Sequence, residues 1–265
     1  MRDFYASSAR VPLDQADGLR RLFSGRQRHV LALASNPHVP FSGVVMDRLA
    51  SVLAASKRNV LVVDAASTSP APHELAGVDL AACIEPLSPR VSYLAARGLP
   101  KAHIDTRGSA GGFIDALQQA APQADVVLLH ADAADLARLF KHRGARPMLL
   151  GADHPESIKH AYANAKLLAG RCGLMTFDLL LTVSSPSPRA EAIATSLAAC
   201  ADNFLGATLV SSALIDPAGD PAEPADPALA ALLTAQLALD EAPGPLAARK
   251  GATPDARPDS RPAFR

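Results

Sequence analysis

The chain has 265 residues, of which 49% are hydrophobic, and its formal net charge is zero. This length is enough to bury a sizeable core in one or two domains, and the neutral charge gives no general attraction to nucleic acid or to an acidic surface. With eight phenylalanines, three tyrosines and no tryptophan, few side chains are available to stack on bases.

The cysteines indicate a reducing compartment, and the hydropathy of the sequence indicates no membrane span. The three cysteines are far apart and match no disulfide or metal motif. The N-terminus has no apolar signal core, and no run reaches the roughly 18 apolar residues of a membrane span. We therefore expect a cytoplasmic location, with polar or membrane-peripheral placement only through partners.

Residues 1–28 form the first predicted segment, which is basic, with six arginines and three aspartates. It contains LDQADGLRRLF, in which Ala16, Leu19 and Phe23 share a helical face. Gly18 inside this stretch costs about 1 kcal/mol relative to alanine, so we expect the helix to form when it docks on another surface. The alternative is an amphipathic helix packed on its own domain.

Residues 29–216 alternate short apolar runs with segments of helical period. The predicted strands are Val30–Ala34, Val60–Asp64, Val91–Ala95, Asp125–His130, Met148–Ala152, Phe177–Val183 and Ala207–Ile215. Runs such as DVVLL are apolar without alternation, as in strands that helices cover on both faces. The pattern predicts an α/β fold with a doubly wound, mostly parallel sheet, helices on both faces and any ligand at the carboxyl ends of the strands.

Residues 217–265 form a different segment, with nine prolines and mixed charges. This composition is typical of disorder. Four leucines predict one short helix near residues 228–240. Its flanks are acidic, whereas membrane-surface helices carry Lys and Arg on their polar face. We therefore expect this helix to dock on the protein itself rather than on lipid.

The loop SNPHVPFSG follows the first predicted strand and precedes an amphipathic helix. Phosphate-binding loops use glycines to direct N–H groups at the anion, a lysine for the β- and γ-phosphates and a hydroxyl for Mg²⁺. Here Pro37 and Pro40 each remove an N–H donor, and no lysine or arginine lies between His29 and Arg48. The loop therefore lacks the groups that bind phosphate. An ordinary turn in a fold that never bound nucleotide is the alternative interpretation.

The frame around this loop resembles the deviant P-loop ATPases of the MinD/ParA group, whose loop reads S-G-K-G-G-x-G-K-T-T. The degenerate positions are Asn36, Pro37, Ser42 and Gly43. Pro37 stands at the signature lysine, Ser42 at the phosphate-binding lysine and Gly43 at the Mg²⁺-binding threonine.

Later segments carry the same resemblance. VLVVDAA, which contains Asp64, is similar to the strand ending in D-A-D, with Ala66 at the second aspartate, and His130 stands where a metal-associated aspartate is expected. HPESIKHAYANAKLLA (His154–Ala169) is similar to the group's P-x-S-I-x-D-A-Y-x-x-I-K segment. Asp64 and Thr182 are interpreted as remnants of a nucleotide site: Thr182 stands near an adenine-contacting asparagine, and Asp64 alone would hold Mg²⁺ poorly.

The stretch DQADGLRRL resembles the helix that precedes the ATPase domain in the flagellar-number regulators, the FlhG/FleN family. In that family this helix engages the partner GTPase of the signal-recognition-particle type, FlhF, and the family also works with basal-body and C-ring proteins. The resemblance implies that Asp14, Gln15, Ala16, Leu19 and Arg20 bind the partner.

Three functions follow from these patterns. The first is a non-catalytic, MinD-like regulator of flagellar number or placement that binds proteins, with no nucleic acid and no cofactor, although the family uses ATP and Mg²⁺. The second is a working ATPase with an atypical loop, for which Lys57, Arg58 and Lys166 are the substitute cations nearest in sequence. The third is another MinD-like accessory protein, of pilus or cellulose synthesis.

Overall fold

The computed structural model describes residues 28–184, 187–220 and 223–241. The residues 1–28 segment with its proposed partner helix therefore lies almost entirely outside the described part. The strands are β1 (His29–Ala34), β2 (Val60–Asp64), β3 (Glu85–Ser88), β4 (Val91–Ala95), β5 (Val126–Ala131), β6 (Met148–Ala152), β7 (Thr176–Thr182) and β8 (Thr208–Ile215). The α-helices are α2 (Ser42–Ala55), α3 (Leu99–Ala102), α4 (Gly111–Ala120), α5 (Ala133–Leu139), α6 (Pro155–Cys172), α7 (Ala190–Leu205) and α8 (Pro227–Glu241).

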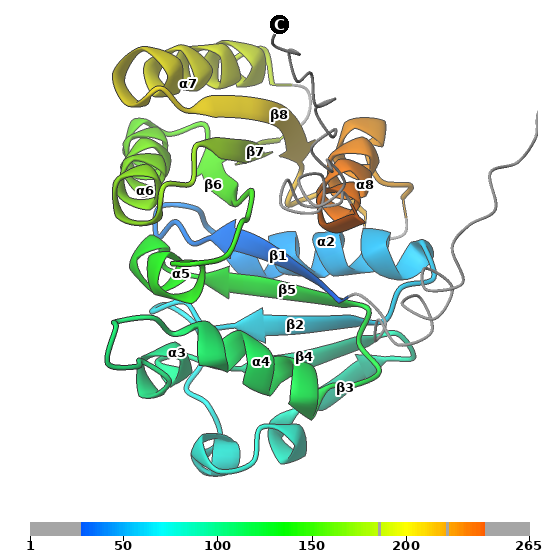
Figure 1. Cartoon of the computed structure of the whole chain (residues 1–265). Coiled ribbons are helices and arrows are strands. Elements are labelled where there is room, and N and C mark those ends of the chain that lie inside the picture. The colour runs from blue at the N-terminus through cyan, green and yellow to red at the C-terminus, as the bar shows by residue number, and fades with distance from the viewer. Residues whose placement is uncertain (1–27, 185–186, 221–222, 242–265) are drawn as a thin grey trace, which may run out of the picture.

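The strands form one eight-stranded sheet in the order β3-β4-β2-β5-β1-β6-β7-β8 (Figure 1). All neighbouring strands are parallel except β3 and β4, which are antiparallel. The predicted fold class, a doubly wound and mostly parallel α/β sheet, is thus confirmed. The inner strands are continuous apolar runs because helices exclude water from both faces.

The sequence did not predict β3. All four of its residues, Glu85–Ser88, are exposed, and it carries a proline. Proline and charge are typical of edge strands, where one side of the backbone needs no ladder partner. Because no described helix covers the side chains of β3, its sequence lacks the apolar run by which a buried strand is recognised.

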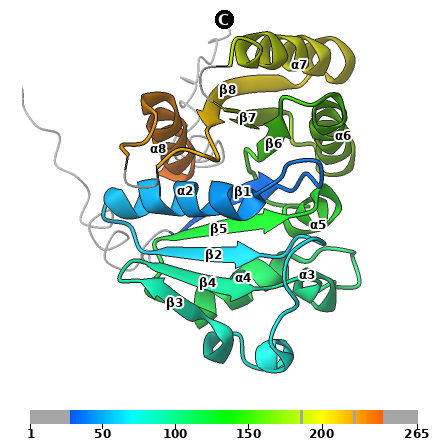
Figure 2. The same cartoon turned by 180° about the vertical axis from the view of Figure 1, so that it is seen from behind.

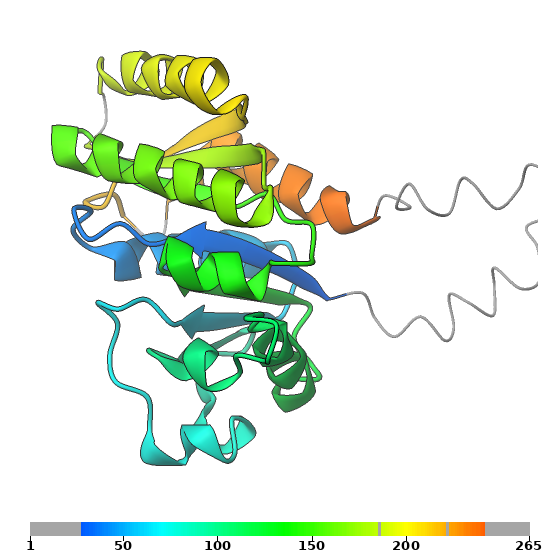
Figure 3. The ribbon, with the colours of Figure 1, turned by 60° about the vertical axis from the view of Figure 1, so that its left-hand side comes forward.

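Helices cover both faces of the sheet. Helices α2 and α8 cover one face, as the view from behind shows (Figure 2). Their apolar side chains pack with those of β1 and β5. Helices α4, α5, α6 and α7 pack on the other face and follow one another along it in chain order, from green to yellow in Figure 3. No helix among the described residues is long and apolar enough to cross a membrane.

Helix α8 packs on the sheet through Leu229, Leu232 and Leu233, which are buried in the same cluster as β1. It contacts β8 and β1. The two helices on this face therefore share one core, although α2 and α8 are far apart in sequence. This face of the sheet is fully covered only when α8, which begins at Pro227, is present.

A buried polar network fixes α8 to the sheet. Asp178 of β7 is fully buried and accepts hydrogen bonds at one oxygen from Arg146 Nε (2.9 Å) and from Gln236 Nε2 (2.6 Å). Its other oxygen accepts from the backbone and hydroxyl of Ser211. Gln236 also donates to the carbonyl of Arg146 (2.7 Å). One carboxylate thus joins β7, β8, α8 and the turn before β6.

Replacing Asp178 with alanine leaves the Arg146 side chain, which is 10% exposed, without its carboxylate. A buried charge that loses its partner is strongly destabilising, so we expect the free energy of unfolding to fall by about 3–5 kcal/mol. Urea denaturation measures this change. Asp202→Ala, at an exposed position of α7, is the control and should change stability by less than about 0.5 kcal/mol. Similar small effects of both variants would contradict the role given to the network.

Candidate functional site

The candidate site lies at the carboxyl edge of the sheet, around the loop that joins β1 to α2. In open α/β sheets, ligands bind at this edge. The loop is short and joins the end of β1 at Ala34 to the start of α2 at Ser42. Its conformation therefore depends on the side chains that it contacts. Three features of this edge bear on function: the anchoring of the loop, a buried carboxylate on β2 and a pocket beside β7.

Asn36 anchors the loop from inside the protein. Its Nδ2 donates to the carbonyls of Leu150 and Ser157, both at 2.8 Å, and lies 3.0 Å from the Ser157 hydroxyl. Its Oδ1 accepts from the backbone N–H of His38 at 3.1 Å. A second amide, Asn164 of α6, donates to the carbonyl of the preceding Ser35 (2.8 Å). Protein groups thus bond both polar atoms of the Asn36 side chain and the carbonyl of Ser35.

The second half of the loop turns into α2 through a strained residue. Phe41 has a left-handed backbone (φ 62°, ψ 37°) and is 68% exposed. A bulky residue in this region is an outlier, and the cost for a non-glycine residue is about 1–2 kcal/mol. The carbonyl of Phe41 accepts from the N–H groups of Val44 and Val45, which starts the helix. In the loop pattern that the sequence resembles, a glycine occupies this position.

The carboxylate of Asp64 is buried at the end of β2 and is 5% exposed. Its Oδ1 accepts from the hydroxyl of Ser69 and lies 2.7 Å from Nδ1 of His130, at the end of the adjacent strand β5. Tyr93 of β4 lies 3.4 Å from Oδ2. Burial, followed by the charge of Asp64, raises the pKa of Tyr93 to about 12. Tyr93 is therefore a neutral hydrogen-bond donor at any physiological pH.

The pairing of Asp64 with His130 decides what this carboxylate can bind. His130 is 1% exposed, and its Nε2 is buried without a hydrogen-bond partner among the described residues. His130 stands where the resembling ATPases have a metal-associated aspartate, and its imidazole bonds Oδ1 of Asp64, while Oδ2 faces Tyr93. The described residues contain no cluster of three or more His, Cys, Asp or Glu side chains that could hold a metal ion.

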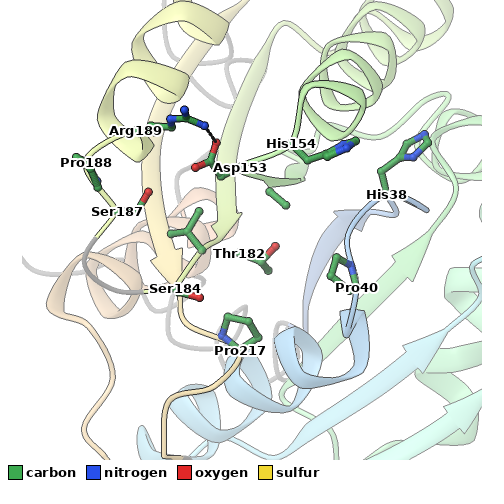
Figure 4. A pocket seen from close by; sticks show the side chains of 12 residues that line it. His38, Pro40, Asp153, His154, Thr182, Ser184, Ser187, Pro188, Arg189 and Pro217 are labelled. Carbon is green, nitrogen blue, oxygen red and sulfur yellow. Dashed lines mark ion pairs between the residues drawn. The ribbon is translucent and has the colours of Figure 1, made fainter.

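A pocket of about 650 Å³ opens on the other side of the loop, between the ends of β6, β7 and β8. We call it the loop pocket; Figure 4 shows His38, Pro40, Asp153, Thr182, Arg189 and Pro217 among its lining residues. Thr182 donates its hydroxyl proton to the carbonyl of Gly151 (3.0 Å), which leaves its oxygen as an acceptor. Arg189 is exposed and lies 3.8 Å from Asp153. The loop pocket thus has Arg189 paired with Asp153, and its walls around the remnant threonine mix prolines with histidine and serine side chains.

Two titratable side chains behind the loop, Asp132 and His160, have shifted pKa values. Burial favours the neutral form of Asp132, but hydrogen bonds from Ser35 (2.5 Å) and Ser67 hold its pKa below the usual value. Burial and the neighbouring His38 lower the pKa of His160, against the opposing effect of Asp132. The rings of His38 and His160 meet edge to face, with centroids 5.7 Å apart. His160 is therefore an aromatic contact for the loop rather than a cation for phosphate.

The predicted site residues do not meet in one cavity. Asn36 is inside the protein, Pro37 is exposed, and Thr182 lines the loop pocket. Ser42 and Gly43, with Asp64, line a separate crevice beside α2. The proposed partner residues Asp14, Gln15, Ala16, Leu19 and Arg20 lie outside the described residues.

The substitute cations of the ATPase hypothesis lie away from the loop. Lys57 and Arg58 follow the far end of α2, whose 14 residues span about 20 Å. Lys166 is exposed on α6. Sequence reasoning missed Arg189, the cation that does lie in the loop pocket, because it is separated from the loop by most of the chain. The only signal was its position before a helical pattern that follows a strand end.

Comparisons with known proteins identify the fold. No protein-family model and no curated protein matches the sequence. A putative plasmid partition protein from Borrelia burgdorferi B31, solved bound to AMPPNP, is similar over 82% of this chain and 100% of its own, with 7% identity and a TM-score of 0.55. Another plasmid partition protein from Borrelia burgdorferi covers 80% and 97%, with 9% identity and a TM-score of 0.52.

The MinD cell division protein of Aquifex aeolicus is similar over 78% of this chain and 97% of its own, with 13% identity and a TM-score of 0.51. At these identities the likeness concerns the fold. The chain therefore has the P-loop NTPase fold of the MinD/ParA type.

The backbone of Phe41 gives a test of the loop conformation. At a left-handed position glycine is favoured over alanine, so we expect Phe41→Gly to be more stable than Phe41→Ala by about 1 kcal/mol. Phe204, 75% exposed in α7, is the matched position with a helical backbone, where alanine should be favoured over glycine by up to about 1 kcal/mol. Thermal unfolding of the four variants measures both differences. The same order at both positions would contradict the left-handed turn.

Proposed function

We propose that this protein is a non-hydrolysing, MinD-like regulator that acts by binding other proteins. The observation that carries the proposal is the contact between Asp64 and His130. In the group that the sequence resembles, carboxylates at these strand ends serve metal and water. Here the carboxylate that matches, Asp64, has its Oδ1 2.7 Å from an imidazole Nδ1 of His130. The loop adds no lysine, and its first half is already bonded to Asn36 and Asn164.

The proposal extends to partner and place on the basis of the sequence. DQADGLRRL resembles the FlhF-binding helix of the flagellar-number regulators, so we propose FlhF as the partner and the control of flagellar number or placement as the role. Basal-body or C-ring proteins are further partners under this proposal. The zero net charge supports protein rather than nucleic-acid partners. The location would be cytoplasmic, at the cell pole or membrane only through these partners.

Titration calorimetry with Mg-ATP tests the loss of nucleotide chemistry. Because the loop has no lysine and Oδ1 of Asp64 is bonded to His130, we expect no heat of binding at micromolar ATP and no change in molecular mass by light scattering when ATP is added. Arg189→Ala is the control for weak contacts in the loop pocket. Micromolar binding by the parent chain, or an ATP-driven increase in mass, would support the ATPase hypothesis instead.

The partner proposal is tested with the full chain and FlhF from the same organism. We expect the full chain to bind FlhF and to change its GTPase rate. Replacing Leu19 and Arg20 together with alanine should remove most of this change, because both side chains lie in the motif that resembles the FlhF-binding helix. Arg10→Ala, also in the basic segment but outside the motif, should leave it intact. No binding by the full chain, or equal effects of both variants, would refute the partner.

A further inference from the structure

The crevice beside α2 is separate from the loop pocket and has a different chemistry. It has a volume of about 380 Å³ and lies between α2, the ends of β2 and β4, and the loop after β2. We call it the α2 crevice and define it by Met46 and Ala50 of α2, Val62 and Asp64 of β2, and Val91 and Tyr93 of β4. Its volume falls at the small end of the range found for small-molecule sites.

The walls of the α2 crevice are apolar and rigid. Met46 and Ala50 face it from a helix, and Val62 and Val91 face it from adjacent parallel strands. All four are buried members of the core on this face. Side chains fixed in this way give a pre-formed surface for a flat or aliphatic group, and the burial of that group would supply the binding energy.

The inner end of the crevice presents an acceptor that is only weakly satisfied. Oδ1 of Asp64 has two close partners, Ser69 and His130. Oδ2 has only the hydroxyl of Tyr93, at 3.4 Å, beyond the usual range for such a bond. A carboxylate has about four acceptor sites, so Oδ2 has room for a donor from a bound molecule.

The charges around the crevice favour a cation. Asp47, exposed on α2, adds a second carboxylate at the mouth, and the lining contains no lysine, arginine or histidine. The imidazole of His130 lies outside the lining and bonds the other oxygen of Asp64, Oδ1. The hydroxyl of Tyr93 adds an acceptor lone pair. A phosphate or carboxylate ligand would meet like charges here, whereas an ammonium group would meet two carboxylates.

We propose that the α2 crevice binds a small amphipathic amine, with its apolar body between α2 and β2–β4 and its ammonium group at Oδ2 of Asp64, while the charge of Asp47 attracts it from the mouth. The inference does not depend on the proposed partner or on the state of the loop pocket. It assigns a ligand to the edge of the sheet that in this chain lacks the cations of a nucleotide site. The ligand would contact α2 and β2 together, the two elements that flank the loop and the Asp64–His130 contact.

The methyl groups of methionine report directly on this site. The sequence has four methionines, of which Met46 lines the crevice, while Met148 is buried elsewhere and Met175 is partly exposed. We would titrate the full chain, ¹³C-labelled at the methionine methyl groups, with phenethylamine, phenethyl alcohol and phenylacetate. These probes share one ring and differ in charge. We expect phenethylamine to shift the Met46 signal, phenethyl alcohol to do so more weakly and phenylacetate to leave it unchanged, with Met148 and Met175 constant throughout.

Two variants and a control make the test specific. Asp47→Asn removes the exposed carboxylate and should weaken phenethylamine binding roughly two- to five-fold, the effect of one exposed ion pair. Ala50→Leu fills the crevice and should weaken it more than tenfold. Asp202→Asn, on α7, should have no effect. Absence of any Met46 shift would refute the site, and equal shifts with all three probes would refute the amine. Neither outcome bears on FlhF binding.

Discussion

The carboxylate of Asp64 is the only acidic side chain at the end of β2, and it is almost fully removed from water. A buried carboxylate is tolerated only when hydrogen bonds or an opposite charge compensate the lost hydration. Ser69, Tyr93 and His130 supply this compensation from three neighbouring segments. The packing of β2, β4 and β5 at this edge therefore depends on how one charge is satisfied. In an ATPase that task would be shared with a metal ion.

The loop between β1 and α2 is also fixed by hydrogen bonds from buried side chains. A phosphate-binding loop leaves its N–H groups open for an anion, and glycines keep the space around them empty. In this protein, the amide side chains of Asn36 and Asn164 hold the first half of the loop, and the loop residue Val39 is buried. The turn from the loop into α2 requires a left-handed backbone at Phe41, which is unfavourable for a bulky residue. Side chains of the protein thus fix the first half of the loop.

Much of the architecture was predictable from sequence because both faces of the sheet are covered. Each inner strand is then an apolar run of five to seven residues, as in VLVVD or TFDLLLT, and the helices between them show a clear period. The exposed edge strand β3 gave no such signal. The positions of Ser42, Asp64 and Thr182 at strand or helix ends were also predictable, since connections in a parallel sheet bring them to one edge.

The contacts made by these residues were not predictable in the same way. That Asp64 meets His130 depends on β2 and β5 being neighbours, although 66 positions separate the two residues in the chain. That Asn36 bonds inward depends on the position of α6, whose Ser157 accepts its hydrogen bonds. Both facts concern spatial order, which the hydrophobic pattern does not encode. The carboxyl edge of the sheet carries two separate cavities: the loop pocket, which contains Arg189, and the α2 crevice, which contains Asp47 and Asp64.

The position of α8 has a practical consequence for where the protein can be shortened. Its leucines shield the apolar side chains of β1 and β8, and Gln236 completes the hydrogen bonds of Asp178. A fragment cut at the end of β8, where the sheet itself is finished, would present this bare strip to solvent and leave a carboxylate short of a donor. Such a fragment would be prone to aggregate even though it kept every strand. Fragments meant for crystallisation or binding work should therefore extend to at least residue 241.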